Sequence, residues 1–244
     1  MKPAIVTLSF DDGAPEDLEI ATLLKKHELA ATFYVPVTNV EGRPTLSPVQ
    51  IVLLSEMGFE IGAHGYHHQY LDRIPATDVY EEIKSGKDQL EQILGQAVTS
   101  FCYPGGKTPV VAVNAVRQLG FRYARTVREC RFSVDDPLLA PTTNPIGWHC
   151  RRHYVKEALL SGNARYCTYF LKHRLWAMDW LDYSLANLEY AVMTGGICHF
   201  WGHAFEIDRN NEWERLERLL LQIETMQNQG QVVTRVNSGS FHGV

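Results

Sequence analysis

Short apolar runs of strand length alternate with longer segments of helical spacing along most of the chain. The strand-like runs are rich in β-branched and aromatic residues and cover residues 4–10, 30–37, 59–63, 98–103, 121–127, 196–201 and 232–236. Helical spacing is found in residues 16–27, 76–94, 109–119 and 213–229, and in two stretches at about 154–173 and 177–193. This alternation predicts βαβ units around a parallel sheet, which places the chain in the α/β class.

A further helix is marked by its ends. Ser47 is a favourable N-cap, Pro48 suits the first helical position, and Gly58 follows the last apolar residue. No linker rich in Pro, Ser or Gly divides the chain, and the sequence contains no internal repeat. We therefore expect one domain over residues 1–244, built either as a barrel or as an open doubly wound sheet.

Composition and charge narrow the class of protein only slightly. The chain is 45% hydrophobic and 21% charged with a net charge of −5. We therefore expect no nucleic-acid or membrane partner, although a local basic patch can be hidden in such a total. The sequence shows neither a signal-peptide pattern nor an apolar run long enough to span a membrane. Its five cysteines form no CxxC pair, which favours reduced thiols in a cytoplasmic protein, and the oligomeric state stays open.

Two adjacent carboxylates, Asp11 and Asp12, directly follow the first predicted strand and precede Gly13. In parallel α/β folds, functional groups gather at the carboxyl ends of strands. One of the two carboxylates could bind a metal ion while the other moves a proton. A turn capped by Asp and Gly is the alternative interpretation.

Two histidines, His64 and His68, follow the third predicted strand. A spacing of four residues puts both imidazoles on one face of a helical turn, with His67 pointing elsewhere; a surface histidine cluster or a helix cap is the alternative. Two histidines and the Asp12 carboxylate would leave coordination positions open for water and substrate, as in catalytic metal sites. Asp11 beside them could supply a general base.

Four segments resemble the motifs of the NodB-type polysaccharide deacetylases, carbohydrate esterase family 4. The run TLSFDDG at 7–13 resembles T-F-D-D-G, and HGYHH at 64–68 is similar to H-[ST]-x-x-H. The run FCYPGG at 101–106 resembles R-x-P-[FY]-G, and ICHFWGH at 197–203 occupies the place of the late hydrophobic-x-His motif. The order and spacing extend over about residues 4–203.

The resemblance implies a distorted (β/α) barrel that hydrolyses an N-acetyl group. By matched position, Asp12, His64 and His68 would hold one divalent metal ion, with zinc as the first expectation. Asp11 would be the base, and the backbone N–H of Gly105 would bind the oxyanion. The expected substrate is an N-acetylated sugar or a related small amide.

The chain departs from the family pattern in three ways. Cys102 stands where the family has an arginine that pairs with the catalytic Asp, Gly65 replaces Ser or Thr, and no fourth motif is recognisable. Arg125, late in the fifth predicted strand, could reach Asp11 and replace the missing arginine. An exposed arginine in a loop is the alternative.

The remaining candidates concern proton transfer and substrate contact. His203 lies just past the strand that contains His199, so we expect His203 to be the general acid and His199 to support it from the barrel wall. Tyr103 and Trp148 are candidate substrate contacts, and Trp148 offers a stacking surface for a sugar ring. Core packing is the alternative role for the tryptophan.

These observations predict a metal-dependent hydrolase that removes an acetyl group from an amino sugar. A first alternative is another C–N hydrolase on the same fold, such as an allantoinase-like enzyme that opens a cyclic ureide. A second alternative is a non-catalytic carbohydrate-binding module, which the presence of Asp11 argues against.

Overall fold

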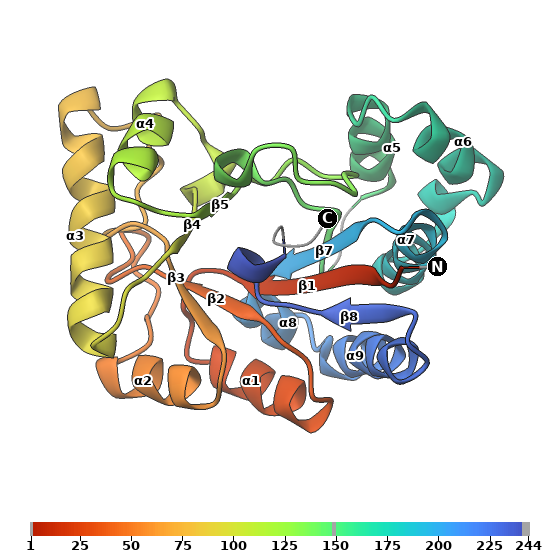
Figure 1. Cartoon of the computed structure of the whole chain (residues 1–244), viewed down its shortest axis with the longest axis horizontal. Coiled ribbons are helices and arrows are strands. Elements are labelled where there is room, and N and C mark those ends of the chain that lie inside the picture. The colour runs from red at the N-terminus through yellow and green to blue at the C-terminus, as the bar shows by residue number, and fades with distance from the viewer. Residues whose placement is uncertain (1, 148–149, 241–244) are drawn as a thin grey trace.

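The computed structural model describes residues 2–147 and 150–240. Within them, parallel strands form one sheet in the order β5-β4-β3-β2-β1-β7-β6, and β8 pairs with the start of β1 (Figure 1). The strands are β1 (Ala4–Phe10), β2 (Thr32–Val35), β3 (Glu60–Ala63), β4 (Ser100–Cys102), β5 (Tyr123–Arg125), β6 (Asn144–Pro145), β7 (Ile197–Gly202) and β8 (Val232–Thr234). β1 is central because it pairs with β7 from Ile5 to Phe10, with β8 at its start and with β2 at its end.

Irregular segments close the sheet into a ring. The chain after β5 forms backbone hydrogen bonds with the chain before β6, from Thr126 N to Ala140 O and from Thr142 N to Arg128 O, both at 2.8 Å. β6 then pairs with β7, which returns the ring to β1. The fold is therefore the distorted (β/α) barrel that the family resemblance implies, and the open doubly wound sheet is excluded.

Helices cover the outside of the sheet, and their apolar faces form the core against the strands (Figure 1). They are α1 (Asp17–Lys26), α2 (Pro48–Glu56), α3 (Ala76–Leu94), α4 (Val110–Gln118), α5 (Arg151–Leu160), α6 (Ala164–Lys172), α7 (Trp180–Thr194), α8 (Ala204–Arg209) and α9 (Trp213–Asn228). The predicted N-cap of α2 is confirmed, because Ser47 forms a capping box with Gln50. None of the helices described is both long and apolar enough to cross a membrane.

The expected helix at 154–173 is wrong, because the structure has two helices there. α5 ends at Leu160, Gly162 adopts a φ of +65°, and the Asn163 side chain caps α6 by accepting a hydrogen bond from Tyr166 N at 3.0 Å. Left-handed glycine stops a helix and an Asn cap starts one, so these turn residues override the apolar spacing. β6 and α8 were not expected, because each is too short to produce a periodic pattern.

Candidate active site

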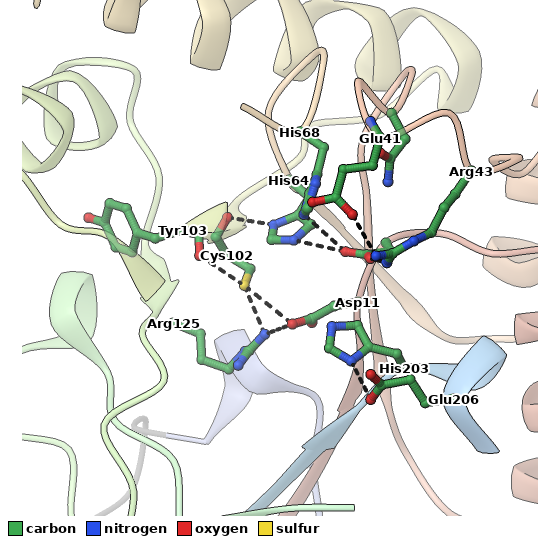
Figure 2. A network of polar contacts seen from close by, with 12 residues as sticks. Asp11, Glu41, Arg43, His64, His68, Cys102, Tyr103, Arg125, His203 and Glu206 are labelled. Carbon is green, nitrogen blue, oxygen red and sulfur yellow. Dashed lines mark hydrogen bonds and ion pairs between the residues drawn. The ribbon is translucent and has the colours of Figure 1, made fainter. Parts of the chain in front are cut away.

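The predicted chemical residues meet at the carboxyl ends of the strands (Figure 2). Asp11 and Asp12 directly follow β1, and His64 directly follows β3. They open into a pocket of about 220 Å³, whose wall includes seven of the residues that the sequence singled out: Asp11, Asp12, His64, His68, Tyr103, Gly105 and His203. The sheet topology therefore gathers groups that lie far apart in the sequence.

Asp12, His64 and His68 form a compact buried cluster. Asp12 Oδ1 lies 3.5 Å from His64 Nε2 and 3.0 Å from His68 Nε2, yet this oxygen has no hydrogen-bond partner among the described residues. Burial alone would raise the pKa of Asp12, but the two imidazoles hold it well below its ordinary value. A buried carboxylate oxygen that faces two ring nitrogens without hydrogen-bond geometry suits a shared cation.

The orientation of His64 supports a role as a metal ligand. Its Nδ1 donates a hydrogen bond to the backbone oxygen of Cys102 at 2.8 Å (Figure 2). A carbonyl oxygen can only accept, so this bond fixes the tautomer and leaves the lone pair of Nε2 facing Asp12. Ligating histidines are commonly anchored through the other ring nitrogen in this way.

The turn between His64 and His68 is not helical, so the helical turn expected from their spacing is wrong. Gly65 and His68 adopt φ values of +81° and +58°, and the segment from 64 to 68 forms no helix. The two imidazoles nevertheless converge, with ring centroids 4.8 Å apart. A left-handed residue at each of these positions bends the chain enough to bring the rings together, at the cost of strain at His68.

Glu82 of α3 holds this turn, and sequence reasoning missed it. Its Oε1 accepts hydrogen bonds from the backbone N–H groups of Tyr66 and His67 at 3.0 and 2.7 Å, and its Oε2 contacts His67 Nδ1 at 2.8 Å. A Cβ on Gly65 would lie 3.0 Å from Glu82 Oε1. Glycine at this position therefore leaves room for the buried carboxylate that organises the turn.

Arg125 lies against Asp11, so the alternative of an exposed loop arginine is wrong. Its side chain is fully buried between the rings of Tyr34 and Trp201, with the guanidinium carbon 5.4 and 5.0 Å from their centroids. Nη2 donates to Asp11 Oδ2 and to Cys102 Sγ, the latter at 2.8 Å. The small Cys102 side chain thus leaves space for an arginine that arrives from the adjacent strand.

A second group of potential ligands, Asp11, His64 and Cys102, is also close enough for an ion. Two observations argue against it. The Arg125 guanidinium already touches both Asp11 and Cys102, and a cation there repels a second one. Burial raises the pKa of the Cys102 thiol well above its ordinary value, which disfavours the thiolate that a metal requires. The Asp12 set is the better cation site.

The buried pair of Asp11 and Arg125 predicts a coupled effect on stability. Arg125→Met should lower the free energy of unfolding by roughly 3–5 kcal/mol, because it leaves a buried carboxylate without its cation. Asp11→Asn combined with Arg125→Met should lose clearly less than the two single variants together, since no uncompensated charge remains. Denaturant unfolding of the three variants measures this coupling. Additive losses would mean that the two side chains do not interact.

His203 and His199 lie in different surroundings. His203 precedes α8 at the pocket, and its Nδ1 donates to Glu206 Oε2 at 3.1 Å (Figure 2). Burial opposes its protonation, but Glu206 and the two aspartates raise its pKa. His199 is buried in β7, where its Nε2 contacts Ser9 Oγ at 2.9 Å. Burial and the nearby Arg125 charge lower the pKa of His199 well below its ordinary value, so it is neutral in this setting.

The candidate substrate contacts divide into three cases. Gly105 lines the pocket with a φ of +59°, and a Cβ there would approach the Tyr70 ring to 2.8 Å. Tyr103 also lines the pocket, but its ring turns away from the cluster (Figure 2). Its hydroxyl donates to Leu138 O at 2.9 Å. Trp148 lies outside the described residues. Of the two described residues, Gly105 is therefore the one whose backbone is exposed in the pocket.

Arg43 is a further pocket residue that sequence reasoning missed. It donates from Nη1 to Asp12 Oδ2 at 2.9 Å and from Nη2 to Glu41 Oε2 at 2.5 Å. Its guanidinium carbon lies 4.3 Å from the centroid of the Phe205 ring. Arg43 thereby occupies one oxygen of Asp12 and leaves the other for the two histidines. Its position in the loop after the second strand was the available signal, because that loop starts at the same end of the barrel.

Comparison with known proteins identifies the family. The model of the polysaccharide deacetylase family matches residues 1–124, just over half of the chain. The chain belongs to this family. The peptidoglycan-N-acetylmuramic acid deacetylase PdaA of Bacillus subtilis is 27% identical over 124 residues, which are 50% of this chain and 46% of PdaA. The chain therefore matches less than half the length of this relative.

Two solved structures show the same fold. A family 4 acetyl xylan esterase from Clostridium thermocellum in complex with a cobalt ion aligns over 97% of this chain and 90% of its own, with 15% identity and a TM-score of 0.57. The Streptococcus pyogenes deacetylase PplD in complex with acetate aligns over 55% of this chain and 62% of its own, with 22% identity and a TM-score of 0.52. The barrel assignment thus extends nearly to the full length of the chain.

Proposed function

We propose that the protein is a metal-dependent deacetylase that hydrolyses the N-acetyl group of an amino sugar. The observation that carries this proposal is the buried set of Asp12, His64 and His68, whose ligand atoms all lie within 4.8 Å of one another beside Asp11. This arrangement combines a cation site with a neighbouring carboxylate that is available as a base. A binding module would need the pocket but not that second carboxylate.

In this proposal the three ligands hold one divalent ion, with zinc as the first candidate. The bound ion would lower the pKa of water and polarise the amide carbonyl. Asp11 takes a proton from the attacking water, and the Arg125 guanidinium keeps its carboxylate in place. The Gly105 N–H donates to the developing oxyanion. His203 gives a proton to the departing amine, so the C–N bond breaks to release acetate and the free amino sugar.

The substrate class rests on chemistry and on relatives. PdaA and PplD are named as deacetylases, and the pocket of about 220 Å³ suits a single acetamido group with part of its sugar ring. Trp201 and Tyr70 in the pocket wall offer apolar surface to that ring. The cytoplasmic location stays a prediction, and it favours a soluble acetylated saccharide as the substrate.

Release of acetate tests this proposal against the allantoinase-like alternative. Purified enzyme loaded with zinc should release acetate from oligosaccharides of N-acetylglucosamine and should leave allantoin intact. An assay of both substrates with and without a chelator measures the difference. Ring opening of allantoin without acetate release would favour the other C–N hydrolase, and no turnover of any acetylated substrate would favour the binding module.

The acid role of His203 predicts a selective effect on the leaving group. His203→Ala should cripple hydrolysis of an amide, by about 10²–10⁴-fold, but largely spare an activated ester whose leaving group needs no proton. Parallel kinetics on one amide and one such ester measure the selectivity. His199→Ala is the matched control. If the selective loss appears in His199→Ala instead, the two histidines have exchanged roles.

A further inference from the structure

A basic, apolar surface lies away from the pocket, in the segment 151–178. This segment contains six Lys and Arg residues and a single acidic residue, Glu157, although the whole chain has a net charge of −5. It forms α5 and α6, which lie outside the ring of strands at the upper right of Figure 1. Positive charge is therefore concentrated in this segment, although the net charge of the whole chain is negative.

Apolar side chains are exposed at the same place. Leu159 and Leu160 of α5 are 71% and 61% exposed. Tyr154 and Ala158 bury the opposite side of this helix in the core, so the two leucines are not needed for packing. Together with Val155 and Trp176 they line an open groove of about 520 Å³. Exposed large apolar residues gathered in one groove mark an interaction surface.

The basic side chains of the groove lie on the same face of α5 as its exposed leucines. Arg152 and Lys156 line the groove, and their spacing of i and i+4 places them on the same side of α5 as Leu159. Lys156 contacts Glu157 at 3.0 Å, but the Lys156 side chain is 67% exposed, so solvent screens this contact and the ammonium group stays accessible to anions. Basic side chains beside exposed leucines can complement an anionic membrane surface, where cations meet the headgroups and apolar side chains meet the acyl boundary.

We propose that this surface, formed by Arg152, Val155, Lys156, Leu159, Leu160 and Trp176, docks the protein on an anionic phospholipid bilayer. The basic residues complement the negative headgroups, while the leucines and Trp176 enter the boundary with the acyl chains. Charge complementarity favours this occupant over a second copy of the chain, because a symmetric dimer through this groove would bring the two sets of cations together.

The surface and the pocket lie toward opposite ends of β7. Ser161, directly after α5, lines a cavity with Gly196 directly before β7, whereas Trp201 near the end of β7 lines the pocket. The proposal does not depend on the deacetylase activity, since membrane binding can be measured without turnover.

Co-sedimentation of the full chain with extruded vesicles tests the proposal. We expect binding to phosphatidylcholine vesicles that contain about 30% phosphatidylglycerol, and at least about tenfold weaker binding to pure phosphatidylcholine. Raising the salt concentration to about 0.5 M should weaken binding to the anionic vesicles, since the attraction is screened. Equal binding to both vesicles, or none to either, overturns the proposal.

Variants locate the surface. Leu159→Ser with Leu160→Ser, and separately Arg152→Glu with Lys156→Glu, should each weaken binding to the anionic vesicles by at least about tenfold. Val49→Ser with Val110→Ser is the matched control, because these valines are 79% and 76% exposed on α2 and α4, and it should bind like the parent chain. Equal binding by all the variants overturns the proposal. A parent chain that sediments as a dimer, and becomes a monomer in the leucine variant, also overturns it by assigning the groove to a second copy.

Discussion

His64→Ala or Asp12→Ala is expected to abolish tight metal binding and acetate release together. Each substitution removes one of three ligands from a buried cluster, and the remaining two cannot fill the coordination of a catalytic ion. The parent chain should carry about one divalent ion, whereas the variants should carry close to none after dialysis. Elemental analysis of the purified proteins together with acetate release measures both effects.

His67→Ala is the matched control for the metal prediction. His67 belongs to the same turn, but its ring faces Glu82 rather than Asp12. Glu82 still accepts the backbone N–H groups of Tyr66 and His67 in this variant, so the turn should keep its shape and the ion should stay bound. Full metal content in Asp12→Ala and His64→Ala would contradict the ligand assignment.

Asp11→Asn is expected to lower turnover by about 10²–10⁴-fold while the ion stays bound. The amide cannot take a proton from water, but its oxygen can still accept a hydrogen bond from Arg125, which preserves the geometry of the buried pair. Single-turnover kinetics combined with metal analysis separate these two effects. Unchanged turnover would make Asp11 a structural residue, and loss of the ion would make it a ligand.

Much of the site could be predicted from the sequence because several of its polar residues directly follow the predicted strands. Asp12 and His64 each follow a buried apolar run, and parallel strands bring such positions to one edge of the sheet. The alternation of strands and helices left a barrel and an open sheet as alternatives, and the motif resemblance favoured the barrel. Arg125 was found by the same logic, since a neighbouring strand end is within reach of Asp11.

The parts that could not be predicted depend on tertiary contacts without a local pattern. Glu82 lies on an amphipathic helix where glutamate is ordinary, and only the packing of α3 on the turn at Gly65 gives it a role. Arg43 lies in a loop without periodicity, so the sequence signals only that this loop starts at the same end of the barrel and does not signal the contact with Asp12. The closure of the barrel likewise rests on irregular backbone hydrogen bonds near Ala140 that no alternation of apolar residues encodes.

The central claim is that one cation binds between Asp12, His64 and His68. A crystal of the zinc-loaded protein, measured on both sides of the zinc absorption edge, tests this claim directly by locating the ion. The account predicts one anomalous peak at about 2.0–2.2 Å from Asp12 Oδ1 and from the Nε2 atoms of both histidines. A peak between Asp11 and Cys102, or no peak in the pocket at all, would contradict it.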